Sequence, residues 1–205
     1  MRDITEQLEA IRRQVAQADT DEGEGVAVII RRTYRAEVDD VWDAITNPER
    51  LPRWFAPVSG DLKEGGSFQI ENNAGGDILR CAPPHLLRMT YGAPNSIVEV
   101  RLTEAGPDRT DLEVAHTVPL SVAGGAAGAL YVGPGWDQGF LHLAWHLAGE
   151  DFGDPAAAEN SIEGQELSRG SIAAWADTVR ATSLATEDAL NAAIAAAAAH
   201  FAPNL

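Results

Sequence analysis

Five histidines and a single cysteine are the side chains of this 205-residue chain best suited to metal, acid–base or nucleophilic chemistry. His142 and His146 are four residues apart, a spacing at which two imidazoles on one helix can bind a metal ion. A zinc protease would carry a glutamate directly after the first histidine, but that position holds Leu143, and no third ligand is evident. The pattern favours histidines that face solvent or a partner. We therefore predict no metal and no cofactor.

His116 is the histidine best placed for acid–base chemistry, because it lies in a strand-like segment. A general base there would need a positioned partner. Asp111 and Glu113 are close in sequence, but the sequence does not place them on the same face, so a satisfied or half-buried histidine is the simpler interpretation. Cys81 follows Arg80, whose charge could lower a thiol pKa, but nothing else supports a nucleophile. We predict no catalytic residue.

The composition describes an acidic chain, with a formal net charge of -16, a pI of about 4.5 and 45% apolar residues. An acidic surface repels phosphates, so we expect neither nucleic acid nor membrane as a partner. The longest apolar run, Ala192 to Ala199, is far shorter than the ~20 residues of a membrane span. The opening residues Met1 to Ile4 lack the apolar run of a signal peptide, and the lone cysteine permits a reducing compartment. We expect a cytoplasmic protein.

The elements that must position these residues begin with an expected N-terminal helix, because Ile4, Leu8, Ile11 and Val15 recur at helical spacing. The acidic, glycine-containing run Asp21 to Gly25 then predicts a solvated linker.

A series of strands and turns follows, starting with a strand from about Val26 to Tyr34 and continuing to about Val118. A helix is expected over Val38 to Ile45, and a second short helix is expected to begin at Pro48. Gly65-Gly66 and Gly75-Gly76 indicate hairpins. Consecutive hairpins predict one antiparallel sheet of about six strands. The alternation from Ile97 to Leu102 leaves the facing of that strand ambiguous, and Ser121 to Gly128 is expected to be a loop.

A long helix should lie across the concave face of this sheet, because four apolar residues recur at i, i+4, i+7 and i+11: Trp136, Phe140, Leu143 and Leu147. Leu141 and Trp145 fall on its opposite face and form an apolar patch that needs a cover. Helices with apolar stripes follow between Ser161 and Phe201. We predict that they pack on the outer face of the long helix, either in cis or from a second subunit.

The chain resembles START-like (SRPBCC, helix-grip) proteins, in the branch of the activator of heat-shock-protein-ninety ATPase homologues. Four segments carry the resemblance in the right order: Val38–Thr46 with Pro48–Phe55, the hairpin Asp61–Phe68, the Pro-Pro strand Cys81–Tyr91, and Gly135-Trp136. The resemblance covers roughly Val26 to Gly149. It implies an α+β fold, a curved antiparallel sheet around a long C-terminal helix, with a cavity between them that accepts an apolar or aromatic molecule.

The residue patterns and the resemblance together predict three parts: an N-terminal helix and acidic linker (1–25), a START-like helix-grip domain (26–150) and a helical C-terminal extension (151–205). The cavity is expected between the sheet and the long helix. We predict that its ligand-binding walls include eight residues: Trp42, Phe55, Met89, Tyr91, His116, Trp136, Phe140 and Leu143.

Three functions stay open on this basis. The first is binding of a small hydrophobic or aromatic molecule in the cavity, whose apolar walls with a few polar groups are usual for such sites. The resemblance also allows a stress-response regulator of a heat-shock ATPase, with a chaperone as its partner. A cyclase or aromatase-type enzyme is the third; it would need a convergent acid and base, and the sequence does not favour it. A homodimer is also compatible with the sequence.

Overall fold

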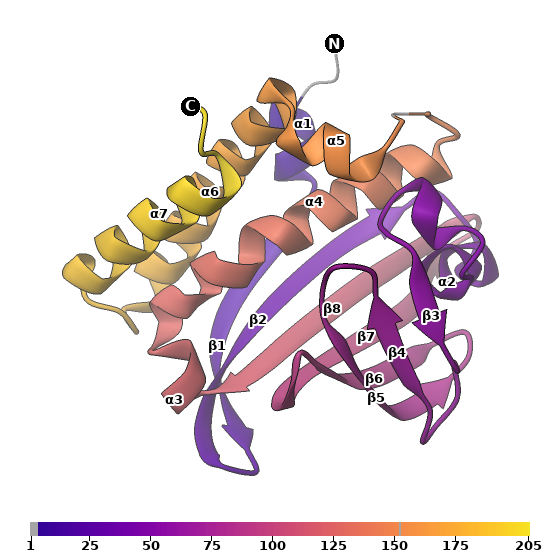
Figure 1. Ribbon diagram of the computed structural model, residues 1–205, viewed down its shortest axis with the longest axis horizontal. Coiled ribbons are helices and arrows are strands. Elements are labelled where there is room, and N and C mark those ends of the chain that lie inside the picture. The colour runs from indigo at the N-terminus through magenta and orange to yellow at the C-terminus, as the bar shows by residue number, and fades with distance from the viewer. Residues whose placement is uncertain (1–3, 152) are drawn as a thin grey trace.

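The structure, a computed structural model that describes residues 4–151 and 153–205, is an α+β fold in which one curved sheet wraps a long helix (Figure 1). Eight strands of the described residues form the sheet in the order β1-β2-β8-β7-β6-β5-β4-β3, and every neighbouring pair is antiparallel. The strands are β1 Arg12–Thr20, β2 Gly23–Tyr34, β3 Val58–Gly60, β4 Ser67–Ile70, β5 Gly75–Ala82, β6 Leu86–Tyr91, β7 Ala93–Gly106 and β8 Arg109–Pro119. The expected α+β helix-grip fold is confirmed.

The N-terminal segment differs from the expected helix through Val15. Helix α1 covers only Ile4–Glu9, and the following residues form the edge strand β1, in which Val15 pairs with Val28. The expected linker from Asp21 to Gly25 is instead the turn and the first residues of β2. The prediction was wrong because a spacing of four residues, as between Ile11 and Val15, fits one face of a strand as well as one turn of a helix. Beyond this segment the sheet has seven strands, where about six were expected.

Short helices between β2 and β3 close one end of the sheet. They are α2, Val38–Thr46, and a 3-10 turn, Leu51–Arg53. Val41 and Ala44 are fully buried on α2. This placement confirms the expected helix in the segment.

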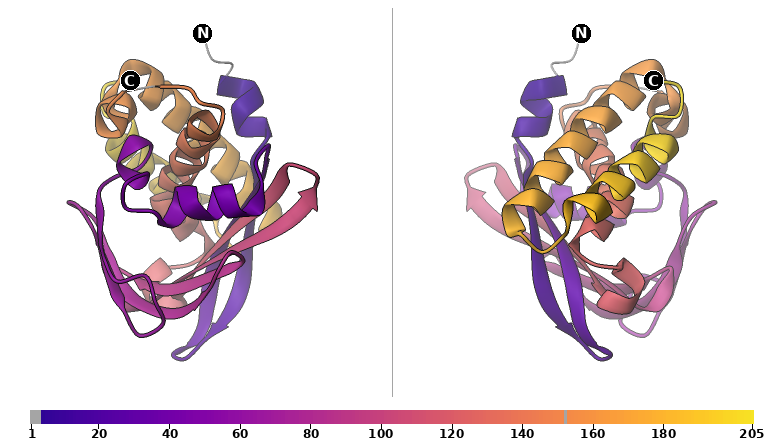
Figure 2. Two further views of the ribbon diagram at one scale, coloured as in Figure 1. Left: turned by 90° about the vertical axis from the view of Figure 1, so that its right-hand side faces the viewer. Right: turned by 90° about the vertical axis from the view of Figure 1, so that its left-hand side faces the viewer.

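The long helix α4, Ala129–Leu147, lies across the concave face of the sheet (Figures 1 and 2). The segment expected to be a loop before it contains a short helix α3, Leu120–Ala123, and a 3-10 turn, Ala126–Gly128. Helix α4 starts before the expected first turn and passes through Pro134, a residue that costs an exposed helix about 3 kcal/mol. Tertiary packing stabilises the helix at this turn. Trp175 packs so closely against Gly133 that a Cβ added to this glycine would lie 2.5 Å from Cε2 of Trp175.

The C-terminal extension packs in cis on the side of α4 that faces away from the sheet (Figure 2). It consists of α5, Pro155–Asn160, α6, Ile162–Thr182, and α7, Glu187–Phe201. Leu141 of α4 is fully buried and Trp145 is 9% exposed, so the apolar patch is covered as expected. Side chains of the sheet, α4, α6 and α7 belong to one hydrophobic cluster. The division of the chain into three parts stays a prediction.

A buried polar network joins β1, α4 and α6. Asp137 of α4 is fully buried, and its Oδ2 accepts hydrogen bonds from Arg13 Nε (2.8 Å), Trp175 Nε1 (3.1 Å) and Ser171 Oγ. Burial raises the pKa of Asp137 to about 6, so the carboxylate is ionised at pH 7. One buried carboxylate therefore fixes three segments that are far apart in sequence.

Candidate functional site

A cavity of about 760 Å³ lies between the concave face of the sheet and α4. Its size falls within the 300–1,000 Å³ that is usual for small-molecule sites. The sheet side is apolar and includes Leu87, Met89, Val98, Val100 and Leu112. The helical side is formed by α4 and by the α2–β3 connection. The sheet and the helices therefore both contribute to the walls of the cavity.

Seven of the eight predicted ligand-binding residues line this cavity: Phe55, Met89, Tyr91, His116, Trp136, Phe140 and Leu143. Trp42 does not line it. The buried stripe of α2 is formed by Val41 and Ala44, and Trp42 is half-buried beside that stripe. Leu51 and Trp54 of the following turn take the place expected for it. Binding of a ligand by these residues stays a prediction.

Several cavity residues lay outside the sequence prediction. Val98 and Val100 of β7 face the cavity, whereas Glu99 and Arg101 form an ion pair on the other face. The alternation of charged and apolar residues in β7 could have predicted which side chains face the cavity, because a charged side chain favours the solvated face of a half-buried strand. Four cavity residues come from the C-terminal extension, and no local pattern signals their position: Glu159, Asn160, His200 and Phe201.

Three aromatic side chains from three different elements meet in the cavity. The ring centroid of Tyr91 (β6) lies 5.7 Å from that of His116 (β8) and 5.7 Å from that of Trp136 (α4). His116 and Trp136 are 5.9 Å apart and meet edge to face at 86°. Phe68 of β4 lies 6.4 Å from Tyr91 and extends this wall. Tilted and edge-to-face rings at these distances attract one another, so they form a preorganised surface for a further ring.

Both ring nitrogens of His116 have hydrogen-bond partners. Trp136 Nε1 donates to Nδ1 at 3.3 Å, and Nε2 lies 2.8 Å from Ser96 Oγ. Since an indole N–H can only donate, Nδ1 must be unprotonated, and the neutral ring carries its proton on Nε2. That N–H then donates to the Ser96 hydroxyl. Burial lowers the pKa of His116 to about 4, which keeps the imidazole neutral at pH 7.

The contact between Ser96 and His116 does not form a nucleophile–base pair. In a serine hydrolase the nitrogen that faces the serine is unprotonated, and the other nitrogen donates to a carboxylate. Here the nitrogen that faces Ser96 carries the proton, and the other accepts from an indole. His116 therefore cannot take the serine proton in this arrangement. His116 is thus a histidine whose ring nitrogens both have hydrogen-bond partners, as expected.

The free energy of unfolding is expected to fall as the pH drops from about 6.5 to about 4, because His116 takes up a proton more readily in the unfolded chain than in the native protein. The native pKa is depressed below that of the unfolded chain, so the unfolded state binds the proton first. The stabilisation is present above pH 6.5 and is lost towards pH 4, with a limiting size of about 3 kcal/mol. Urea unfolding of the wild type and of His116→Gln at several pH values measures it.

The difference between the two proteins isolates the imidazole from other groups, such as Asp137, that titrate in the same range. A difference in free energy of unfolding that stays constant from pH 7 to pH 4.5 would contradict a neutral native His116.

The other residues with chemical potential have structural partners. His142 is buried, 4% exposed, with its ring 5.5 Å from that of Trp145, so the expectation that it faces solvent or a partner is wrong. Helices α6 and α7 pack on α4, so residues of α4 outside its sheet-facing stripe can also be buried. Cys81 is half-buried, and burial followed by the charge of Glu64 raises the pKa of its thiol, so Cys81 is not an activated nucleophile.

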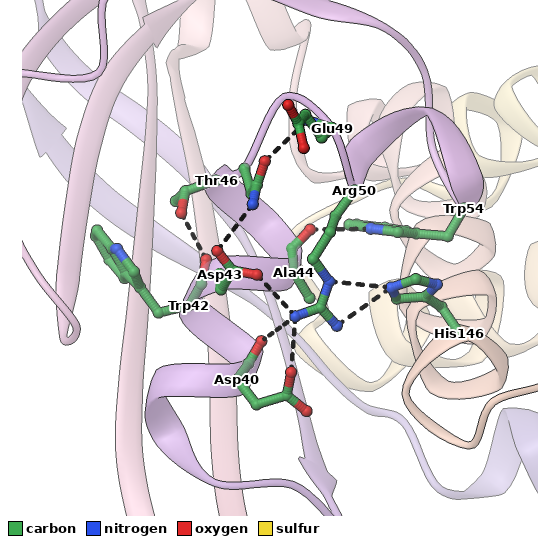
Figure 3. A network of polar contacts seen from close by, with 10 residues as sticks. Asp40, Trp42, Asp43, Ala44, Thr46, Glu49, Arg50, Trp54 and His146 are labelled. Atoms are coloured by element: carbon green, nitrogen blue, oxygen red, sulfur yellow. Dashed lines mark hydrogen bonds and ion pairs between the residues drawn. The ribbon is translucent and has the colours of Figure 1, made fainter.

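His146 takes part in a polar network around Arg50 that ties α2 to α4 (Figure 3). Arg50 Nη1 donates to Asp40 Oδ1 (2.7 Å) and Asp43 Oδ2 (2.9 Å), and its Nε donates to His146 Nε2 (3.3 Å). Burial, followed by the charges of Arg50 and Arg53, lowers the pKa of His146, so the neutral ring accepts. Its Nε2 lone pair is thus engaged. No group of three metal-binding side chains occurs in residues 4–151 and 153–205.

A curved antiparallel sheet that grips one long helix around an apolar cavity defines the START-like, helix-grip class of proteins. The profile of the family described as activator of Hsp90 ATPase homolog 1-like protein matches residues 35–148, more than half of the chain. The chain belongs to this family, as the sequence resemblance indicated.

Solved structures support the assignment. CalU16 from Micromonospora echinospora is 38% identical with a TM-score of 0.70, and the match covers 83% of this chain and 98% of CalU16. DynU16, a protein from the dynemicin biosynthetic locus, is 25% identical with a TM-score of 0.53, over 63% of this chain and 49% of DynU16. EF2215 from Enterococcus faecalis shares the fold, at 15% identity and a TM-score of 0.59, over 85% of this chain and 95% of that protein.

The match with CalU16 extends beyond the family profile. The match covers 83% of this chain, which is more than all residues up to 148, where the family profile ends. It therefore includes part of the C-terminal extension. Among curated proteins, no sequence matches this chain significantly. Within the described residues, no helix has both the length and the apolar character needed to cross a membrane.

Proposed function

We propose that this protein binds a small hydrophobic or aromatic molecule in the cavity between the sheet and α4. The observation that carries the proposal is the cavity of about 760 Å³ itself, lined mostly by apolar and aromatic side chains. The cluster of Tyr91, His116 and Trp136 supports an aromatic ligand, because it offers ring edges and faces already held in place.

The polar groups in the cavity favour binding over catalysis. His116, the histidine best placed for a general base, has both nitrogens engaged and a lowered pKa. General acid–base catalysis would need a group poised near the working pH and within reach of a substrate proton. His116 is therefore better explained as a fixed polar contact in a binding wall than as a catalyst.

A structural relative points the same way. DynU16 comes from a biosynthetic locus, a setting in which a small molecule is produced. This supports a small-molecule ligand for the present chain more than a chaperone partner, which the family description alone suggests. The chaperone partner, a homodimer and a cytoplasmic location stay predictions.

Substitution of Gly139 tests the cavity directly. Gly139 lies on α4 and lines the cavity, and a Cβ added there would have no atom within 4 Å. Gly139→Leu is expected to weaken binding of the fluorescent aromatic alcohol pyrenylbutanol by more than about tenfold, since the new side chain occupies the ligand's space. Thermal stability should not fall, because a helical glycine is about 1 kcal/mol less favourable than other residues.

Gly139→Ala is the matched variant, with the same backbone benefit but only one methyl group in the cavity. Its affinity for pyrenylbutanol should lie between those of the wild type and Gly139→Leu. Native mass spectrometry of freshly purified wild type and Gly139→Leu would also reveal any retained ligand. The proposal fails if the wild type binds no hydrophobic probe, or if the leucine variant binds as tightly as the wild type.

A further inference from the structure

The C-terminal extension forms part of the cavity as well as covering α4. Glu159 and Asn160 at the end of α5 line it, as do His200 and Phe201 at the end of α7. The Phe201 ring lies against Gly135 of α4, with its Cε1 3.7 Å from the position of an added Cβ. Helix α5 follows the end of α4 in the chain and packs on α6 (Figure 1). Since Asn160 and His200 are exposed, these residues lie at a solvent-facing edge of the cavity, which we call its mouth.

The charged side chains that line the cavity in residues 4–151 and 153–205 are acidic. Two carboxylates line the cavity, Asp61 and Glu159, and no lysine or arginine among the described residues does so. Asp61 already forms an ion pair with Lys63. The whole chain carries a net charge of -16, so the field at the opening disfavours an anionic ligand and attracts a cation.

Glu159 is the carboxylate at the mouth that lacks a partner. It is half-buried, and its side chain makes no hydrogen bond or ion pair with any residue of 4–151 or 153–205. Burial raises its pKa. A partly desolvated carboxylate gains more from a cationic hydrogen-bond donor than an exposed one does.

The inner part of the cavity is apolar and aromatic rather than charged. Tyr91, Trp136 and Phe140 surround it with rings, and His116 there is neutral. An apolar interior with a carboxylate at its opening fits a ligand with an apolar body and a charged end.

We propose that the ligand is an aromatic molecule that carries a basic amine, with its rings against Tyr91 and Trp136 and its ammonium group at Glu159. This inference rests on the proposed function, because it assigns chemistry to the same cavity. The C-terminal extension then selects the ligand, while the sheet and α4 supply the apolar volume.

Three probes with one ring system and one linker test the assignment: pyrenylbutylamine, pyrenylbutanol and pyrenylbutyrate. The flexible butyl chain lets the end group move independently of the rings. Dissociation constants come from fluorescence titration at low ionic strength. The wild type is expected to bind the amine about tenfold more tightly than the alcohol, the effect of one charge-assisted hydrogen bond, and the butyrate least tightly.

Glu159→Gln keeps the shape of the side chain and removes its charge. It should weaken amine binding by about tenfold and change alcohol binding by less than about twofold. Glu163→Gln is the control, since Glu163 is an exposed acid of α6 that does not line the cavity, and it should leave the preference unchanged.

Equal binding of the three probes by the wild type, or an unchanged preference for the amine in Glu159→Gln, would overturn the assignment of a cationic ligand end and leave the binding cavity intact. Absence of binding for all three probes would instead defeat the proposed function, and this inference with it.

Discussion

Removal of all residues after Gly149 is expected to abolish cooperative unfolding of the protein. The deleted part contains five large apolar side chains that are at most 5% exposed: Leu167, Ile172, Trp175, Val179 and Leu190. Each contributes about 1.5–3 kcal/mol by burial, and together they approach or exceed the 5–15 kcal/mol stability of a typical domain. Circular dichroism and urea titration of the truncated chain measure the loss.

A point substitution gives a finer test of the same docking. Trp175→Ala should lower the free energy of unfolding by about 3–5 kcal/mol, because it leaves a cavity against Gly133 and removes a hydrogen bond to Asp137. Ile162→Ala is the control on the same helix, since Ile162 is 57% exposed and its loss should cost about 0.5 kcal/mol or less. An unchanged melting temperature after truncation would show the extension to be a mobile appendage.

Loss of one partner from the buried ion pair is the second large expected effect. The Arg13 and Asp137 side chains are 7% and 0% exposed, and their contact joins β1 to α4. Arg13→Met should lower the free energy of unfolding by about 3–5 kcal/mol, because the buried carboxyl group of Asp137 loses its cation and must either stay charged without a partner or take up a proton. Arg31→Met is the matched control on the neighbouring strand, since Arg31 pairs with Glu113 at the surface and should contribute about 1 kcal/mol or less.

The double variant Arg13→Met with Asp137→Asn separates charge from shape. The asparagine oxygen can still accept from Ser171 and Trp175, and no unpaired charge stays buried. Its stability should therefore lie well above that of Arg13→Met alone. Equal urea midpoints for the single and double variants would show that lost packing, rather than the uncompensated charge, explains the single variant.

The amino-acid sequence was sufficient for the central architecture. Paired glycines and alternating apolar residues indicate hairpins because turn geometry and strand period are local properties. The stripe of Trp136, Phe140, Leu143 and Leu147 indicated the gripped helix for the same reason, since residues that share a helix face recur at 3.6-residue intervals. Family segments from Val38 to Trp136 then placed most of the cavity walls, and seven of eight predicted residues line the cavity.

Tertiary structure was needed for the features that depend on contacts distant in sequence. Val15 fits a helix and a strand equally well, and pairing with Val28 made its segment a strand. Pro134 stays inside α4 because Trp175 packs against Gly133, 42 positions away in the chain. The proton of His116 is placed by an indole from α4. Glu159 reaches the cavity because α5 packs on α6, which docks against α4 together with α7, and no periodicity within a segment encodes where these helices dock.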